Sequence, residues 1–156
     1  MSTAEKIRYD MATEADYEQI GSILLHANAI EADQYDRGLV LDDYELQDLL
    51  DRLKMILRDS EFGICFTAKA GTKVVGLVVC YVNGRRGFIQ DIWVEKSVRG
   101  GRQCSELMNR AMEYFEYRRC WRVNCSTAVQ NESVRKMLVK RGFREISVNF
   151  QTEVEA

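Results

Sequence analysis

Four consecutive residues, Arg99-Gly100-Gly101-Arg102, stand between a short alternating stretch and a long amphipathic one. Residues 88–94 alternate and are rich in aromatic and β-branched side chains, which predicts a strand, whereas the apolar residues that follow recur at helical spacing. A glycine turn that leads into a helix presents unpaired backbone N–H groups and the positive end of the helix dipole. We expect this turn to bind a phosphate; a solvated basic loop in an ordinary strand–loop–helix connection is the other interpretation.

Metal and disulfide chemistry are not predicted. The five cysteines, at positions 65, 80, 104, 120 and 125, lie in apolar stretches without paired C-x-x-C spacing, so we expect reduced thiols. His26 is the only histidine, and no cluster of metal-ligand residue types surrounds it. We therefore assign His26 no role.

The elements that must position the glycine turn can be read from periodicity and from turn residues. Strands are predicted over 6–10, 62–68, 73–81, 88–94, 122–127 and 144–153, and helices over 13–27 and 42–57, from the turn to Tyr117, and over 131–141. Residues 62–94 should form an antiparallel meander, whereas the crossover helix should make 122–127 parallel to 88–94. The prediction is one domain over 1–156, with a mixed α/β (α+β) fold and a central sheet of about six strands.

Charge is distributed unevenly along the 156 residues. Residues 1–60 hold 14 acidic and 6 basic side chains, and residues 85–144 hold 14 basic and 6 acidic ones, although the formal net charge is -2. A basic half suits a polyanionic cofactor and an acidic half suits a cationic substrate; solvated surface of either sign is the alternative. Seven acidic residues could line an acceptor site, or could simply be the solvent-exposed surface of this part of the chain: Glu31, Asp33, Asp36, Asp42, Asp43, Glu45 and Asp48.

Two classes of protein are disfavoured. A pI near 5.6 and the lack of nucleic-acid-binding motifs argue against nucleic acid as a partner. The N-terminus has no apolar signal region, and the longest apolar run, 74–82, is too short to span a bilayer. We expect a cytoplasmic protein with no membrane partner.

The order of elements resembles the fold of the GCN5-related N-acetyltransferase (GNAT) family over nearly the whole chain. Val94-x4-Arg99-Gly100, followed by an amphipathic helix, is similar to the family's pyrophosphate loop, (Q/R)-x-x-G-x-(G/A). A second motif, Asn131-x-x-Val134-x-x-Met137-Leu138-x-x-x-Gly142-Phe143, is similar to N-x-x-A-x-x-L-Y-x-x-x-G-F. The resemblance implies a mixed sheet that is antiparallel except for its fourth and fifth strands, with acetyl-CoA bound between these two.

The resemblance also implies roles for individual residues. The backbone of Ile92, Trp93 and Val94 would hold the pantetheine arm, and the Val94 N–H would polarise the thioester carbonyl. The backbone from Arg99 to Cys104, through Gly100, Gly101, Arg102 and Gln103, would hold the pyrophosphate. Asn131 would fix the arm from the other side.

The sequence departs from the family pattern at three positions. Arg102 and Cys104 replace small loop residues, which weakens the expected phosphate site, although Arg102 could itself pair with a phosphate. Leu138 replaces the tyrosine that often protonates the leaving thiolate, and Ser126 or a water could substitute for it. Asp91 shares a face with Trp93; it could deprotonate an amine through water, or be a structural partner for an arginine.

We therefore expect an acetyl-CoA-dependent N-acetyltransferase in which a primary amine attacks the thioester directly. The alternative is a GNAT-like domain that has lost catalysis and serves as a binding or interaction module. Expected partners are acetyl-CoA and an amine-bearing small molecule or protein, and a homodimer is left open.

Overall fold

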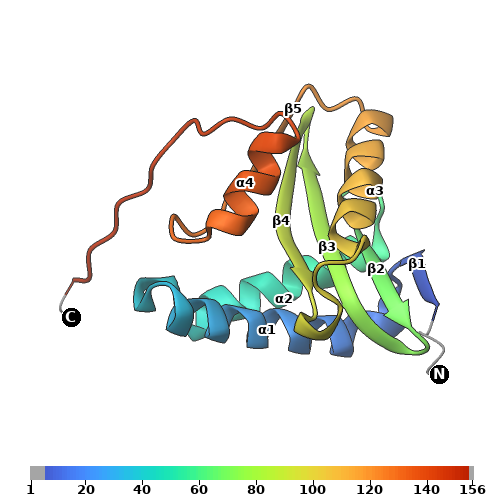
Figure 1. Ribbon diagram of the computed structural model, residues 1–156, viewed down its shortest axis with the longest axis horizontal. Helices are drawn as coiled ribbons and strands as arrows, with labels where there is room; N and C mark the ends of the chain where they lie inside the picture. The colour runs from blue at the N-terminus through green and yellow to red at the C-terminus, as the bar shows by residue number, and fades with distance from the viewer. Residues whose placement is uncertain (1–5, 155–156) are drawn as a thin grey trace.

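The computed structural model describes residues 6–154 and is built on one mixed sheet (Figure 1). Its strands lie in the order β1-β2-β3-β4-β5, and all neighbours are antiparallel except β4 and β5, which are parallel. The strands are β1 (Ile7–Met11), β2 (Gly63–Ala70), β3 (Lys73–Asn83), β4 (Arg86–Val94) and β5 (Arg122–Cys125). This topology confirms the predicted mixed fold and its parallel pair.

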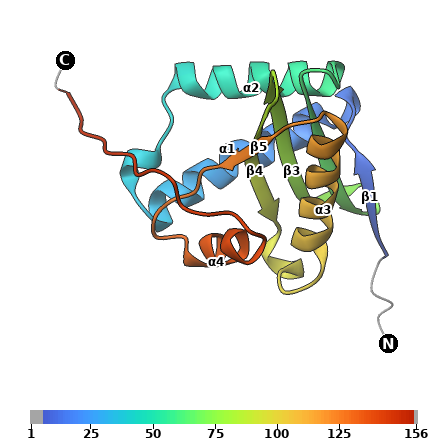
Figure 2. The ribbon, with the colours of Figure 1, turned by 90° about the horizontal axis from the view of Figure 1, so that it is seen from above.

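Helices cover both faces of the sheet (Figure 1, Figure 2). They are α1 (Tyr17–Gln34), α2 (Asp43–Arg58), α3 (Gln103–Tyr117) and α4 (Glu132–Lys140), with the short 3-10 turns η1 (Glu14–Asp16), η2 (Arg37–Leu39) and η3 (Lys96–Val98). The helix predicted over 13–27 continues through α1 to Gln34, beyond its predicted end. No helix within residues 6–154 is both long and apolar enough to cross a bilayer.

The core has two parts, one on each face of the sheet. Alternate residues of β3 supply them: Val78 and Cys80 face α3 and α4, whereas Leu77 and Val79 face α1 and α2. A central strand buried on both faces must be apolar at every position, and this explains the uninterrupted apolar run in β3.

The helices begin where the sequence supplies capping residues. Asp42 accepts a hydrogen bond from the backbone N–H of Glu45, and the Glu45 carboxylate accepts one from the N–H of Asp42. This reciprocal pair satisfies two of the N–H groups that a helix start leaves unpaired, and it fixes the first turn of α2.

The predicted strand over 144–153 does not form. Residues 144–154, which we call the tail, run as an extended segment from α4 to the far side of the molecule without pairing to the sheet (Figure 1). The alternation of Ile146, Val148 and Phe150 is typical of a strand, but a strand also needs a neighbour to satisfy its backbone groups. Within the described residues the sheet therefore has five strands.

Candidate functional site

The two parallel strands separate part-way along their length. β4 and β5 pair only from Arg86 opposite Arg122 to Ile89 opposite Cys125. At the same point β4 has a bulge. Ile89 lies opposite Cys80 and Asp91 lies opposite the adjacent residue Val79, so β4 has one residue more than β3 between these two pairs. A bulge bends its strand and increases the local twist. From Gln90 onward, β4 has β3 on one side and a gap on the other.

Backbone groups at the end of β4 point into this gap. The N–H of Glu95 donates to the Val75 carbonyl of β3 at 2.8 Å, so that residue faces the sheet. Successive residues of an extended strand direct their N–H groups to opposite sides, so the N–H groups of Val94 and Ile92 face the gap while that of Trp93 faces β3. The predicted oxyanion donor, the Val94 N–H, thus lies at an edge that a ligand can reach.

The basic turn follows directly and begins α3. Gly100 has φ +89°, a conformation that side chains with a Cβ rarely adopt, and a Cβ on Gly101 would lie 2.4 Å from the Gln103 Oε1. Arg102 is the N-cap of α3, and no side chain caps its N–H groups. The Arg99 Nε donates to the Val94 carbonyl at 3.0 Å, which brings its guanidinium to the mouth of the gap. Uncapped helix N–H groups beside two arginines are the features that a helix start needs to bind an anion.

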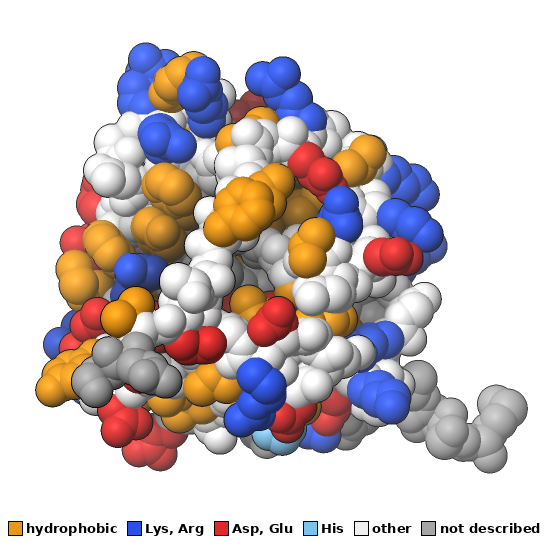
Figure 3. Space-filling view, turned by 90° about the vertical axis from the view of Figure 1, so that its left-hand side faces the viewer, with side chains coloured by type: hydrophobic (Ala, Val, Ile, Leu, Met, Phe, Trp, Pro, Cys, Tyr) orange, Lys and Arg blue, Asp and Glu red, His pale blue; other side chains and the backbone are white. Residues whose placement is uncertain are grey.

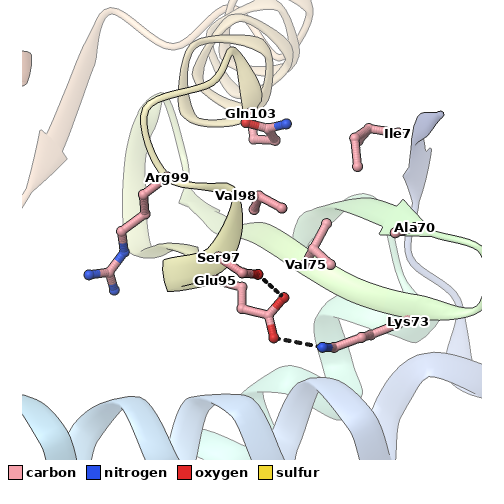
Figure 4. Close-up of a pocket in the computed structure, with 9 residues that line it drawn as sticks. All are labelled: Ile7, Ala70, Lys73, Val75, Glu95, Ser97, Val98, Arg99 and Gln103. Atoms are coloured by element: carbon pink, nitrogen blue, oxygen red, sulfur yellow. Dashed lines mark hydrogen bonds and ion pairs between the residues drawn. The ribbon is translucent and has the colours of Figure 1, made fainter. Parts of the chain in front are cut away.

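Gln103 faces a hollow on the other side of the turn. This hollow has a volume of about 530 Å³, and residues of β1, β2, β3 and the 95–103 turn line it (Figure 4). Within it Glu95 accepts hydrogen bonds from Lys73 at 2.7 Å and Ser97 at 2.9 Å. The buried Gln103 Oε1 has no hydrogen-bond partner among the described residues. Arg99, whose Nε donates to the Val94 carbonyl, is also one of the residues that line this hollow.

Cys104 packs inward. Its side chain is half-buried against the core between the sheet and α3, and burial raises the pKa of its thiol. It therefore does not obstruct the outer side of the turn, where a small residue was expected. Nearby, Arg141 donates to the Ser105 carbonyl and the Asn109 Oδ1 at 3.1 and 3.0 Å, and thereby joins α4 to the first half of α3. Arg141 was not predicted to have a role, because it occupies an unspecified position of the Asn131 to Phe143 motif.

The second motif forms α4. Asn131 is its N-cap, and its Oδ1 accepts from the Val134 N–H at 3.2 Å, which leaves the amide nitrogen free to donate to a ligand. Leu138 is buried in the same core cluster onto which Ile92 and Val94 pack. Ser126 is exposed and follows the last residue of β5, where the two strands separate.

Asp91 lies on the face of the sheet that α1 and α2 cover. Gln90 donates to its Oδ2 at 3.0 Å, and the Arg52 guanidinium reaches only as far as the Gln90 Oε1, at 3.2 Å. Asp91 forms no ion pair within residues 6–154, so the alternative of a direct arginine partner is not what the structure shows. Burial raises the pKa of Asp91 to about 6, and the nearby charge of Glu31 adds to this effect.

Glu31, Gln90 and Arg52 complete the surroundings of Asp91. Glu31 was among the acids that could line an acceptor site, and burial raises its pKa as well. Gln90 and Arg52 were not predicted, because the bulge that turns Gln90 toward Asp91 has no signal in the sequence. Seen from the side of α4 and the tail, the surface is hollowed at its centre, and acidic side chains lie below the hollow (Figure 3).

The model of the acetyltransferase (GNAT) family matches residues 20–143, which is most of the chain. The chain belongs to this family. The match includes the β4–α3 turn and the whole of the Asn131 to Phe143 motif. Acetyl-CoA is accordingly the co-substrate, and the uncapped start of α3 and the positive φ of Gly100 fit its pyrophosphate. No curated protein sequence matches the chain.

Solved structures share the fold at low sequence identity. An aminoglycoside N-acetyltransferase in complex with CoA matches with a TM-score of 0.70 and 17% identity, over 100% of this chain and 99% of that one. An aminoglycoside acetyltransferase from an uncultured soil metagenomic sample matches with 0.68 and 16%, over 96% and 97%. A protein described as a transcriptional regulator, from Bacillus halodurans, matches with 0.68 and 21%, over 96% and 100%. At these identities the likeness shows the fold alone.

Proposed function

We propose that the chain is a single acetyltransferase domain that transfers an acetyl group from acetyl-CoA to a primary amine by direct attack. One observation supports the proposal: pairing of β4 with β5 ends at Ile89, and Asp91, the Val94 N–H and the uncapped start of α3 all follow that point along the chain. These are an electrophile-polarising donor, an anion site and a base, the three groups that such a transfer needs.

The two substrates would bind on opposite faces of the sheet, acetyl-CoA on the side of α3 and α4 and the amine on the side of α1 and α2. The donor half comprises the turn with Arg99 and Arg102, the edge of β4 and the N-cap Asn131, on the side of α3 and α4. Acetyl-CoA supplies a thioester that an amine can attack. The N–H of Val94 would bind the thioester carbonyl oxygen, an interaction that gains strength as negative charge develops there.

The acceptor half lies toward α1 and α2. A primary amine is an ammonium ion at neutral pH and must lose a proton before it can attack. Asp91 has its pKa raised to about 6, so it is ionised at pH 7 and is a stronger base than an ordinary carboxylate. The proton passes to it directly or through a water. Glu31, beside it, would hold a second positive charge of the acceptor.

The leaving thiolate has no tyrosine to protonate it. Leu138 cannot donate a proton, and Ser126 is the hydroxyl at the separation of the strands. A thiol with an ordinary pKa of about 8.5 is a tolerable leaving group, so this absence costs on the order of 10²–10⁴ in rate without abolishing transfer.

We infer a cationic acceptor with more than one amine. The support is the excess of acids in residues 1–60, the placement of Glu31 beside Asp91, and the fold shared with proteins described as aminoglycoside acetyltransferases. Diamines and longer polyamines carry two or more such charges, and basic peptides carry lysine amines.

Release of free thiol from acetyl-CoA tests the proposal. A panel of primary amines, from a monoamine to a polyamine and a lysine peptide, should give turnover that rises with the number of positive charges. Glu31→Gln should remove the preference for the polyamine while leaving the monoamine rate close to wild type. If no amine releases thiol above buffer although acetyl-CoA binds, the enzymatic proposal is wrong.

A non-catalytic binding module is the second candidate, and two observations favour it. Leu138 is a packed aliphatic residue where the family often has tyrosine, and the oxygen of Asn131 is occupied in capping α4. Cys104 does not support this candidate, because it faces the core. Binding of acetyl-CoA without any thiol release is the result that this candidate predicts.

A further inference from the structure

A series of hydrogen bonds leads from α2 to Asp91. The Arg52 Nη1 donates to the Gln90 Oε1 at 3.2 Å, and the Gln90 Nε2 donates to the Asp91 Oδ2 at 3.0 Å. Arg52 forms no ion pair with Asp91 or with any other carboxylate of residues 6–154. The Arg52 guanidinium is therefore linked to Asp91 through one amide.

The bulge in β4 makes this arrangement possible. Ile89 and Ile92 both pack on the α3 and α4 side of the sheet, although residues three apart in a regular strand face opposite sides. The extra residue at the bulge accounts for this, and it leaves Gln90 and Asp91 together on the other side. The helix that carries Arg52, α2, covers that side (Figure 2). Without the bulge, the side chains of Gln90 and Asp91 would face opposite sides and would not meet.

The guanidinium determines which end of the Gln90 amide faces Asp91. A guanidinium has N–H donors and no acceptor, so it can bind only the oxygen of the amide. The amide nitrogen then faces Asp91 and donates to the carboxylate. A donor at this position favours the ionised form of a carboxyl group over the protonated form. The other oxygen, Oδ1, receives no hydrogen bond from the described residues and remains to accept a proton.

Aromatic side chains support the guanidinium. Arg52 lies over the ring of Tyr81, 4.8 Å from its centre. That ring stacks on Phe88 with 4.8 Å between the ring centres, and the ring of Phe62 stacks with it at 6.4 Å. A cation over an aromatic face is attracted to the ring, and a stacked ring is a rigid support. The guanidinium is therefore held where its N–H group reaches Gln90.

The groups that act on Asp91 come from α1, α2, β4 and β5. Burial is the largest cause of its raised pKa and Glu31 of α1 adds to it, whereas Gln90 and Arg52 oppose both. The thiols of Cys65 and Cys125 also lie near, and burial, together with the charge of Asp91, raises their pKa values. Both thiols are therefore neutral near pH 7 and add no charge.

We propose that Arg52 is a positioning residue for acetyl transfer, because it orients the Gln90 amide so that Asp91 is held as a carboxylate. The inference rests on the proposed function, in which Asp91 is the base. Oδ1 takes a proton from the ammonium of the acceptor, and the electron pair of that N–H bond stays on the nitrogen, which then attacks. Without Arg52 the amide can turn and offer its oxygen to protonated Asp91, so a higher pH is needed to form the carboxylate.

The pH profile of kcat/KM for thiol release tests this role. Arg52→Met and Gln90→Met each remove one link, and each should move the acid limb to higher pH by about one unit. The double variant should move it no further than the larger single shift, because the two residues act in series. Additive shifts would show that Arg52 acts on Asp91 independently of Gln90. Either additive shifts or an unmoved limb would overturn the proposal.

Lys54→Met is the matched control. Lys54 is a cation on the same helix and lies 5.2 Å from the centre of the Tyr17 ring, but among the described residues no hydrogen bond links it to Asp91. Its loss removes the same charge and the same kind of contact with a ring, so the acid limb should stay in place. A shift equal to that of Arg52→Met would mean that any charge lost from α2 moves the limb, and would overturn the proposal.

Carbon-13 NMR of the aspartate carboxyl groups follows the titration of Asp91 without turnover, and so separates this inference from the proposed function. The Asp91 signal, assigned by its loss in Asp91→Asn, should titrate at higher pH in Arg52→Met and in Gln90→Met than in wild type. An unmoved midpoint would overturn the role of Arg52 and leave acetyl transfer standing. A midpoint that moves in a protein that releases no thiol, or whose acid limb stays fixed, would remove Asp91 from catalysis and overturn the role as well.

Discussion

Asp91 is a carboxyl group that the fold buries without an ion pair to any of residues 6–154. The pKa of Asp91 is raised from 3.8 to about 6: burial and the Glu31 charge raise it, while the Gln90 hydrogen bond and the Arg52 charge lower it. Between pH 3.8 and about pH 6, Asp91 is protonated in the native state but ionised in the unfolded chain. The stability that this proton contributes is complete below pH 4 and is lost as the pH rises through about 6.

Asp91→Asn should therefore stabilise the protein at pH 8, by on the order of 2 kcal/mol, because the amide removes a buried charge. At pH 4 the variant and wild type should be about equally stable. Urea unfolding at the two pH values measures the difference. A loss of stability at pH 8 would mean that the Asp91 carboxylate is held by a favourable partner.

Asp16→Asn is the control for this measurement. Burial alone would raise the pKa of Asp16, but hydrogen bonds from Lys69 and from the Thr13 N–H, and the Lys69 charge, outweigh it and lower that pKa. A lowered pKa gives stability that is present at neutral pH and lost in acid. Asp16→Asn should thus lose stability at pH 8, opposite in sign to Asp91→Asn.

The raised pKa also predicts the pH dependence of turnover. If Asp91 is the base, kcat/KM should rise about tenfold per pH unit below pH 6 and level off above it, since only the carboxylate accepts a proton. Asp91→Asn should lower kcat/KM by about 10²–10⁴-fold and remove this acid limb. An unchanged rate and profile in the variant would assign the base elsewhere.

Leu138 tests whether proton donation to the thiolate limits the rate. Leu138→Tyr places a hydroxyl where the family often has one, and Leu138→Phe has the same ring without it. Both should lose stability, by about 1–3 kcal/mol, because Leu138 is packed in the core. Thiol release should be at least tenfold faster with Tyr than with Phe, within the range of general acid catalysis of about 10²-fold or more. Equal rates would show that Ser126 or water already suffices.

At the scale of single elements, the β4–α3 turn allows a test that distinguishes the effect of backbone strain on stability from the effect on acetyl-CoA binding. Gly100 and Gly142 both have positive φ, +89° and +94°, and a Cβ at either would meet no atom within 4 Å. Gly100→Ala and Gly142→Ala should therefore cost similar stability, about 1–2 kcal/mol each. Only Gly100→Ala should weaken acetyl-CoA binding, because it distorts the start of α3. If calorimetry gave wild type and Gly100→Ala the same affinity for acetyl-CoA, Gly100 would not belong to the donor site.

Element types follow from periodicity, whereas their ends depend on partners. The motifs around 99–104 and 131–143 predict the turn and α4, because each has local turn and capping chemistry. β5 is predicted to extend to Thr127 but ends at Cys125, where pairing with β4 stops. That stop coincides with the bulge at Gln90, and a bulge is set by the neighbouring strand. Periodicity therefore predicts the two strands but not the gap between them.

At the scale of the whole molecule, apolar periodicity in the sequence predicts that a helix or strand has an apolar face, but it does not predict which other segment packs against that face. The alternation in 144–153 correctly indicates an extended backbone, yet the segment pairs with no strand. Of the acids in residues 1–60, Glu31 lies close enough to Asp91 to raise its pKa, and the acceptor site that these acids could line stays a prediction. The convergence of Arg52 and Gln90 on Asp91 could not be predicted, because it depends on how α2 packs across the sheet.

Calorimetric titration of acetyl-CoA into the purified protein is the decisive experiment, since the gap and the uncapped α3 must bind it. Wild type should bind acetyl-CoA, and Arg99→Ala with Arg102→Ala should weaken binding by about 1–3 kcal/mol for each charge-assisted hydrogen bond removed, with no effect on a pantetheine fragment that lacks the diphosphate. Arg58→Ala, an exposed arginine paired with Glu14, is the control and should change neither affinity. No binding of acetyl-CoA to wild type, or equal weakening for CoA and pantetheine, would contradict the proposed donor site.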